Sequence, residues 1–232
     1  MAQLSANRRV AMGRNAIPEI TAMKTMPPVS SHDRILMSAK RLFACNGYEN
    51  TSTIAIAREA GTSESQLMKH FGSKQGLLSA IFEGGWENIG HRVRSAGQNA
   101  AGGNRLFAAL EALALELETD PELKDLITLE SHRIRKDTRD VLMTQGFQRF
   151  VDEIEGILED MRRRGQIGAD ISLEAVRAAV IGMTEGLLRD PVVARRSGTP
   201  AHYNFEDMRK TLGVLLGAFD SNGSQPAKAV AR

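Results

Sequence analysis

The chain has 232 residues, of which 42% are hydrophobic and 25% charged, a composition typical of a globular protein large enough to bury a core. No stretch approaches the ~18 consecutive apolar residues of a membrane span, and no apolar segment follows Arg8, Arg9 and Arg14 as it would in a signal peptide. The single cysteine, Cys45, excludes an internal disulfide, so we expect a cytoplasmic protein without a membrane segment.

The net charge of +2 is unevenly distributed along the chain. Residues 1–30 carry four Lys or Arg against one acid, residues 31–82 carry six against four, and the remainder carries twenty against twenty-three. Any polyanion would therefore meet the front of the chain. We expect residues 1–30 to be a flexible arm, which is either a disordered tail or a basic segment that touches phosphates or a minor groove.

The pattern between residues 31 and 82 predicts four helices with hydroxyl side chains at their starts and glycines at their ends. Hydroxyl oxygens accept from the free N–H groups of a first turn, and glycine tolerates the left-handed conformation that stops a helix. We expect helices over 31–46 with Ser31 as its cap, over 53–60 after Ser52, over 62–71 after Gly61, and from Ser73 towards Arg94.

The rest of the chain also shows helical periodicity and no sustained two-residue alternation, so the predicted fold is all-α. Asp120-Pro121 is a strong helix start, because proline tolerates the first helical position, whereas Asp190-Pro191 is expected to end a helix. The predicted helices span 105–118, 121–135, 137 or 138 to 164, 173–188 and 205–219, and residues 222–232 are expected to form a flexible tail.

The second and third predicted helices, with Gly61 between them, have the spacing of a helix-turn-helix. Gln66 could pair with adenine and Glu64 could accept from cytosine, while Lys69 and Lys74 could meet phosphates. The free N–H groups at Ser52, Ser63 and Ser73 could also receive phosphates. The side chains predicted to face outward are Ser63, Glu64, Ser65, Gln66, Lys69 and His70. The alternative is a three-helix unit that serves packing alone.

A set of residues spread over about fifty positions without a gap forms one pattern: Arg34-Ile35-Leu36, Ala39, Leu42-Phe43, Gly47-Tyr48, Thr51-Ser52, Ile56-Ala57, Ala60-Gly61-Thr62-Ser63, Leu67, His70-Phe71, Ser73-Lys74 and Leu77-Leu78. This pattern closely resembles the N-terminal domain of the TetR family of transcriptional regulators. The resemblance implies an N-terminal three-helix helix-turn-helix DNA-binding domain (31–82), followed by an α-helical ligand-binding and dimerisation domain (83–221). It also implies a cytoplasmic homodimeric repressor that is released from a near-palindromic operator by a small molecule.

The resemblance also assigns roles to individual residues. Ser52, Thr53 and Lys74 occupy positions at which the family contacts phosphates, and Glu64, Ser65 and Gln66 occupy positions at which it reads bases. Two residues depart from the pattern: Met68 stands where the family usually has a backbone-contacting tyrosine, and Ile54 where it often has a polar or basic residue. Both departures make the expected DNA surface more apolar, and either side chain could touch a thymine methyl group.

The C-terminal part contains a candidate homodimer interface and a candidate effector pocket. The helices at 173–188 and 205–219 are rich in small and apolar residues, and the resemblance implies that they form a homodimer interface; burial within one chain is the alternative. An effector of unknown identity would bind in an apolar pocket, for which ordinary core packing is the alternative. The candidate pocket residues are Trp86, His132, Arg133, Met143, Phe147 and Phe150.

An enzyme is disfavoured, because the five histidines are scattered and neither His-Glu-x-x-His nor Cys-x-x-Cys occurs. Residues 72–76 lack the spacing of a phosphate-binding P-loop, and no cofactor or metal is expected. The remaining alternative is a helical ligand-binding or interaction module that has lost DNA binding, which the apolar Ile54 and Met68 would explain.

Overall fold

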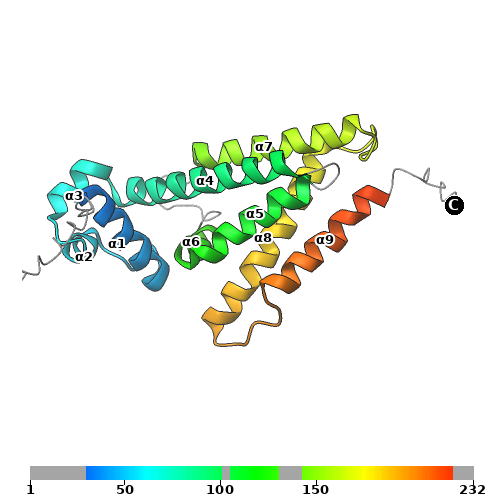
Figure 1. Ribbon diagram of the computed structural model, residues 1–232. Coiled ribbons are helices and arrows are strands. Elements are labelled where there is room, and N and C mark those ends of the chain that lie inside the picture. The colour runs from blue at the N-terminus through cyan, green and yellow to red at the C-terminus, as the bar shows by residue number, and fades with distance from the viewer. Residues whose placement is uncertain (1–29, 101–104, 131–142, 222–232) are drawn as a thin grey trace, which may run out of the picture.

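The computed structural model describes residues 30–100, 105–130 and 143–221, and these residues form nine α-helices and no strand (Figure 1). The predicted all-α fold is therefore confirmed. The helices are α1 (Ser31–Asn46), α2 (Thr53–Glu59), α3 (Glu64–Phe71), α4 (Lys74–Asn99), α5 (Arg105–Thr119), α6 (Pro121–Glu130), α7 (Gln145–Arg163), α8 (Leu173–Ser197) and α9 (Phe205–Ser221).

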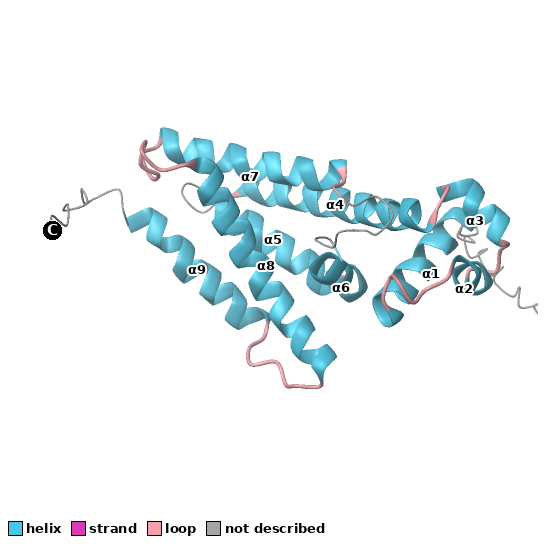
Figure 2. Ribbon diagram, turned by 180° about the vertical axis from the view of Figure 1, so that it is seen from behind, coloured by secondary structure: helices cyan, strands magenta, loops and turns pink. Residues whose placement is uncertain are grey.

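The molecule is elongated, with α1, α2 and α3 gathered at one end, α6 next to α1, and the C-terminal ends of α4 and α7 at the other end (Figures 1 and 2). The long helix α4 connects the two parts: Leu77 and Leu78 are fully buried near its start, and Ile89 and Val93 are fully buried further along. Helices α5 and α7 pack along α4, and α8 packs against α6 and α7. The predicted domain boundary between residues 82 and 83 thus falls inside one continuous helix that both parts share.

Serine side chains cap the first four helices, which explains where each begins. Ser30, Ser52, Ser63 and Ser73 have extended backbones, and each hydroxyl accepts from the N–H three residues later. Each such cap stabilises a helix by about 1 kcal/mol. The prediction of Ser31 as the first cap is wrong by one residue; Ser30 takes that role, and Ser31 becomes the first helical residue.

The predicted start of the helix ending at 164 is wrong. Thr144 has an extended backbone and its hydroxyl accepts from the N–H of Phe147 at 3.2 Å, so α7 begins at Gln145 rather than at Asp137 or Thr138. Glu83 of α4 adds a second acceptor, for the N–H of Gly146 at 2.9 Å. The Thr144 cap is local in sequence, whereas the Glu83 carboxylate is 63 residues away and follows no local pattern.

The prediction that Asp190-Pro191 ends a helix is also wrong, because α8 continues through Pro191 to Ser197. Pro191 has no N–H for the carbonyl of Leu187, four residues earlier, which normally makes such a helix costly. The hydroxyl of Tyr203 donates to that carbonyl at 2.9 Å and replaces the missing bond. Burial, and then the neighbouring carboxylate of Asp190, raise the pKa of Tyr203.

Candidate nucleic-acid interface and ligand cavity

The turn and seam of the helix-turn-helix are built by small and apolar residues. Gly61 has a φ of +62°, which a glycine adopts without strain. Ile56 and Ala57 of α2 and Leu67 of α3 are buried between the helices. Because successive helical residues are about 100° apart, burial of Leu67 turns Ser65 and Lys69 directly outward and places Met68 and Gln66 on opposite flanks.

One flank of α3 lies beside the start of α1 and is polar. The amide nitrogen of Gln66 donates to the hydroxyl of Ser31 at 3.1 Å, and its amide oxygen accepts from Thr62 at 2.6 Å. The same Ser31 hydroxyl lies 3.3 Å from Nε2 of His70. Gln66 is thus held in one orientation by two partners, which use one lone pair of its amide oxygen and one N–H of its amide nitrogen.

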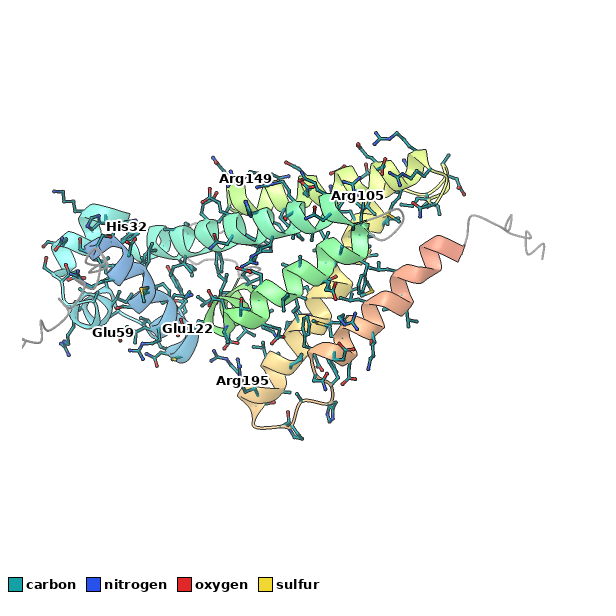
Figure 3. All side chains as sticks on the ribbon, viewed as in Figure 1. His32, Glu59, Arg105, Glu122, Arg149 and Arg195 are labelled. Atoms are coloured by element: carbon teal, nitrogen blue, oxygen red, sulfur yellow. The ribbon has the colours of Figure 1, made fainter. Side chains whose placement is uncertain are left out.

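Two rings and a carboxylate extend this polar flank (Figure 3). The His32 ring stacks on Phe71 with centroids 4.8 Å apart and meets His70 edge-on at 5.6 Å. Nδ1 of His32 lies 3.2 Å from Asp33. The pKa of the Asp33 carboxyl is lowered, first by the hydrogen bond from the Ser30 hydroxyl and then by the hydrogen bond from His32. Ser31, His32 and Thr62 were absent from the predicted site, because their positions suggested helix starts rather than contacts.

The other flank of α3 lies beside α2 and carries the two apolar departures. The hydroxyl of Thr53 donates to the carboxylate of Glu64, which joins the first turns of α2 and α3. Next to this bond, Ile54 is 55% exposed and Met68 is 40% exposed. The two side chains therefore form an exposed apolar edge on the surface that the sequence predicts to meet DNA.

Lys69 and Lys74, the two lysines predicted to contact phosphates, differ in the bonds that they make within the protein. Lys69 points outward, and within the described residues its side chain makes no hydrogen bond or ion pair. Lys74 instead donates from Nζ to the carbonyls of Tyr48, Glu49 and Thr51 at 3.0, 3.4 and 3.1 Å. Its ammonium also lies 4.4 Å from the centroid of the Tyr48 ring. Lys74 thus holds the loop between α1 and α2, a structural role that the sequence did not suggest.

A mostly apolar cavity lies in the C-terminal part of the molecule. It has a volume of about 60 Å³, enough for a few water-sized groups. The cavity brings together Trp86, Met143, Phe147 and Phe150 of the predicted pocket, whereas His132 and Arg133 lie outside the described residues. The other lining residues, which sequence reasoning missed, are Phe82, Leu110, Leu113, Leu117, Ile127, Thr128, Ile181, Glu185 and Leu188.

An aromatic cluster forms one wall of this cavity. The Trp86 ring stacks on Phe150 with centroids 5.1 Å apart and meets Phe147 edge-on at 4.9 Å. Thr128 and Glu185 are the polar residues among the described lining, and the Thr128 hydroxyl donates to the carbonyl of Lys124 at 2.8 Å. The described walls therefore favour an apolar ligand and offer no cation for a buried anion.

Polar contacts join α6, which lines the cavity, to α1 of the helix-turn-helix. Nζ of Lys40 lies 2.6 Å from the carboxylate of Asp120, at the start of α6. Asp125 of α6 accepts from Arg195 and Arg196 at the end of α8, and Arg196 also donates to the carbonyl of Ala44 in α1. Figure 3 labels Arg195 near the end of α8. One cluster thus joins α1, α6 and α8.

Helices α8 and α9 expose an apolar surface. Val214 of α9 is 77% exposed and Leu215 is 46% exposed. On α8, Ala175, Ala178 and Gly182 are exposed, and a Cβ added at Gly182 would meet no atom within 4 Å. In Figure 1 the outer side of α9 carries no further helix.

Two kinds of site are absent from the described part of the chain. No three His, Cys, Asp or Glu side chains there are placed to hold a metal ion. No helix in residues 30–100, 105–130 and 143–221 has the length and hydropathy that crossing a membrane requires.

Similarity to known proteins agrees with this geometry. The chain is 24% identical over 180 residues to the nucleoid occlusion factor SlmA of Photobacterium profundum, which covers 77% of this chain and 91% of SlmA. It is 24% identical over 165 residues to the transcriptional repressor AcnR of Corynebacterium efficiens, and this match covers 69% of this chain and 81% of AcnR. The fold resembles that of the transcriptional regulator FadR of Bacillus subtilis, which was solved in complex with stearoyl-CoA. The TM-score is 0.70 at 18% sequence identity, and the match covers 80% of this chain and 97% of FadR.

Residues 35–81 match the family model described as bacterial regulatory proteins of the tetR family. These are the residues that form most of α1, all of α2 and α3, and the first turns of α4. The helix-turn-helix of this chain is therefore of the type found in the TetR family of transcriptional regulators.

Proposed function

We propose that the protein is a homodimeric transcriptional repressor that binds a near-palindromic operator in the cytoplasm and is released by a small apolar effector. The observation that carries the proposal is the combination of an outward polar face on α3 with an apolar cavity whose α6 wall is joined to α1. The proposal includes no catalytic activity and no cofactor.

DNA binding is supported by the shape and chemistry of the helix-turn-helix. Ser65 and Lys69 face outward at the centre of α3, with Gln66 and Met68 beside them. Side chains in such positions can reach base edges when a recognition helix enters a major groove. The capped first turns after Ser52 and Ser73 present N–H groups to phosphates, in keeping with the assigned roles of Ser52, Thr53 and Lys74. Ser63, Glu64 and His70 complete the proposed surface.

A homodimer through α8 and α9 is supported by their exposed apolar faces. Exposed small residues on α8 let a second helix approach closely, and the exposed side chains of Val214 and Leu215 would be buried against a second copy. Two copies related by a two-fold axis would present two α3 helices to the two half-sites of an operator.

The cavity supports an effector that is apolar where it is buried. A cavity of about 60 Å³ is smaller than the several hundred Å³ of typical ligand sites, so a sizeable effector must push its walls apart. FadR of Bacillus subtilis was solved with stearoyl-CoA, which has a long apolar chain. Acyl-CoA is therefore a candidate class, with its acyl chain in the cavity and its charged part outside.

Displacement of α6 offers a route from effector to DNA. Ile127 and Thr128 of α6 line the cavity. Asp120, just before this helix, bonds to Lys40 of α1. Asp125 within the helix bonds to Arg196 of α8, which also donates to the carbonyl of Ala44 in α1. A ligand that moves α6 would shift α1, and with it the orientation of α3. The extent to which such a ligand weakens operator binding is set by how much more tightly it binds the shifted arrangement of α6 and α1 than the operator-binding one.

A gel-shift titration tests the proposal. Random-site selection with the full chain should enrich a near-palindrome, and binding to it should be sequence-selective and weaken as salt rises. Absence of selective binding would instead favour an interaction module that has lost DNA contact, with Ile54 and Met68 serving a protein partner. Acyl-CoAs of increasing chain length, added to the complex, then test the effector class; thermal shift of the free protein reports binding independently.

A further inference from the structure

Ile54 and Met68 form an exposed apolar edge between α2 and α3. The roles proposed for the other residues of the DNA-binding surface are contacts with phosphates or polar base edges, which apolar side chains do not make. We propose that Met68 and Ile54 read the 5-methyl groups of thymines, so that each half-site of the operator requires thymine beside the α2 flank of α3. This inference rests on the proposed DNA binding and adds which base chemistry the surface recognises.

Helical geometry places both side chains at the same edge. Burial of Ile56 directs Ile54 almost directly away from the core, since the two residues are about 200° apart around α2. Met68 follows Glu64 by one turn on α3, and the carboxylate of Glu64 is bonded to Thr53, the residue before Ile54. The bond therefore joins the first turns of α2 and α3, from which the two exposed apolar side chains extend.

The polar neighbours make these apolar side chains more important for recognition. Gln66 is held by Thr62 and Ser31, and Glu64 is held by Thr53, so protein partners already use part of the hydrogen-bonding capacity of both side chains. Ile54 and Met68 carry no N–H or O–H group on their side chains and lose exposed apolar surface on contact. In the major groove, the thymine methyl is the apolar group that distinguishes one base from the others.

Flexibility and shape suit Met68 to this contact. Its unbranched thioether side chain adapts to irregular apolar surfaces, whereas a side chain with a hydroxyl would favour a phosphate. Burying one methyl group against an apolar side chain changes affinity by roughly three- to fivefold. A dimer makes the contact twice, so replacing the thymine in both half-sites should multiply the effect to roughly tenfold or more.

Deoxyuridine provides the test, because it retains the hydrogen-bonding groups of thymine and lacks its methyl. Starting from the selected operator, each thymine is replaced in turn by deoxyuridine in both half-sites, and Kd is measured by gel shift. We expect at least one position at which the wild-type protein loses roughly tenfold in affinity. At that position Met68→Gln or Ile54→Gln should bind both operators equally, whereas Met68→Leu should retain the discrimination.

Met37→Gln is the matched control, since Met37 is a methionine on α1 that is 64% exposed and lies outside the α2–α3 edge. It should leave both affinities unchanged. Equal Kd values of the wild type for every thymine and deoxyuridine operator would overturn the inference while leaving DNA binding intact. So would weaker binding by Met68→Gln with an unchanged deoxyuridine effect, which would place Met68 on the sugar-phosphate backbone. Failure to select any operator would instead remove the proposed function itself.

Discussion

The helix-turn-helix and the C-terminal part of the molecule differ in how far their stabilising hydrogen bonds reach along the chain. In the first, each helix starts at a serine that bonds to an N–H three residues away. In the second, Thr144 and Ser172 cap α7 and α8 in the same local way, but Glu83 also bonds at the start of α7 and Tyr203 bonds to a carbonyl inside α8, over 63 and 16 residues. Local chemistry therefore predicts the helix-turn-helix from the sequence, whereas the C-terminal part adds bonds that depend on its packing.

Lys74 is an exception to this contrast. The family resemblance assigns it a phosphate contact, yet it also bonds to carbonyls more than twenty residues away. Lys74→Met should lower the free energy of unfolding by about 3 kcal/mol, since three carbonyls lose a charged donor. It should also weaken binding to all DNA sequences and reduce its salt dependence. Urea denaturation and gel shifts at several salt concentrations measure the two effects.

Lys69→Met is the control for this prediction, because Lys69 lies on the exposed face of α3. It should weaken DNA binding without changing the urea midpoint. If Lys74→Met unfolds at the same urea concentration as the wild type, the three carbonyl bonds contribute nothing and the phosphate role stands alone.

Two glycines sharpen the contrast between local and tertiary requirements. A Cβ at Gly146 would lie 2.7 Å from Cβ of Trp86 and 3.2 Å from the carbonyl oxygen of Glu83, so Gly146→Ala should cost about 2 kcal/mol by separating α4 from α7. Gly61 has open space around it but a φ of +62°, so Gly61→Ala should cost roughly 1 kcal/mol through backbone strain. Thermal unfolding compares the two.

The two glycine variants should also differ in function. Gly146→Ala disturbs the aromatic wall of the cavity and should change effector binding, whereas Gly61→Ala disturbs the turn before α3 and should weaken operator binding. Identical functional defects would mean that the two parts of the molecule do not respond separately to local change.

Gln66 tests whether the polar flank reads a base. Gln66→Ala should cost roughly 1–3 kcal/mol at one operator position and leave non-specific binding intact. Because Gln66 also bonds to Ser31, Ser31→Ala should free the side chain and alter the same position. Competition gel shifts with operators changed at single positions measure both variants. A uniform loss across all sequences would contradict base reading by Gln66.

The smallest expected effect concerns the proline in α8. Tyr203→Phe removes the donor to the carbonyl of Leu187 and should cost about 1 kcal/mol. Pro191→Ala restores a backbone N–H that can bond to the same carbonyl, so in a Pro191→Ala background Tyr203→Phe should cost much less. Urea denaturation of the four proteins in this cycle gives the coupling. Equal costs in both backgrounds would show that Tyr203 stabilises the loop in another way.

The amino-acid sequence by itself determined the helix-turn-helix, since hydroxyl caps, glycine stops and the spacing of Ile56, Ala57 and Leu67 act within a few residues. It also placed Trp86, Phe147 and Phe150 on helices that the structure brings to one cavity. The charge and shape of that cavity depend on five helices, and no local pattern encodes their arrangement.

Only the tertiary structure decided that Glu83 bonds at the start of α7, that α8 passes through Pro191, and which distant partners hold Gln66 and Lys74. The physical reason is the same in each case. A backbone or side-chain polar group takes whichever partner lies within hydrogen-bond distance, and here that partner comes from a segment 16 to 63 residues away. Sequence periodicity reports which face of a helix is buried, but it does not report which distant group completes its bonds.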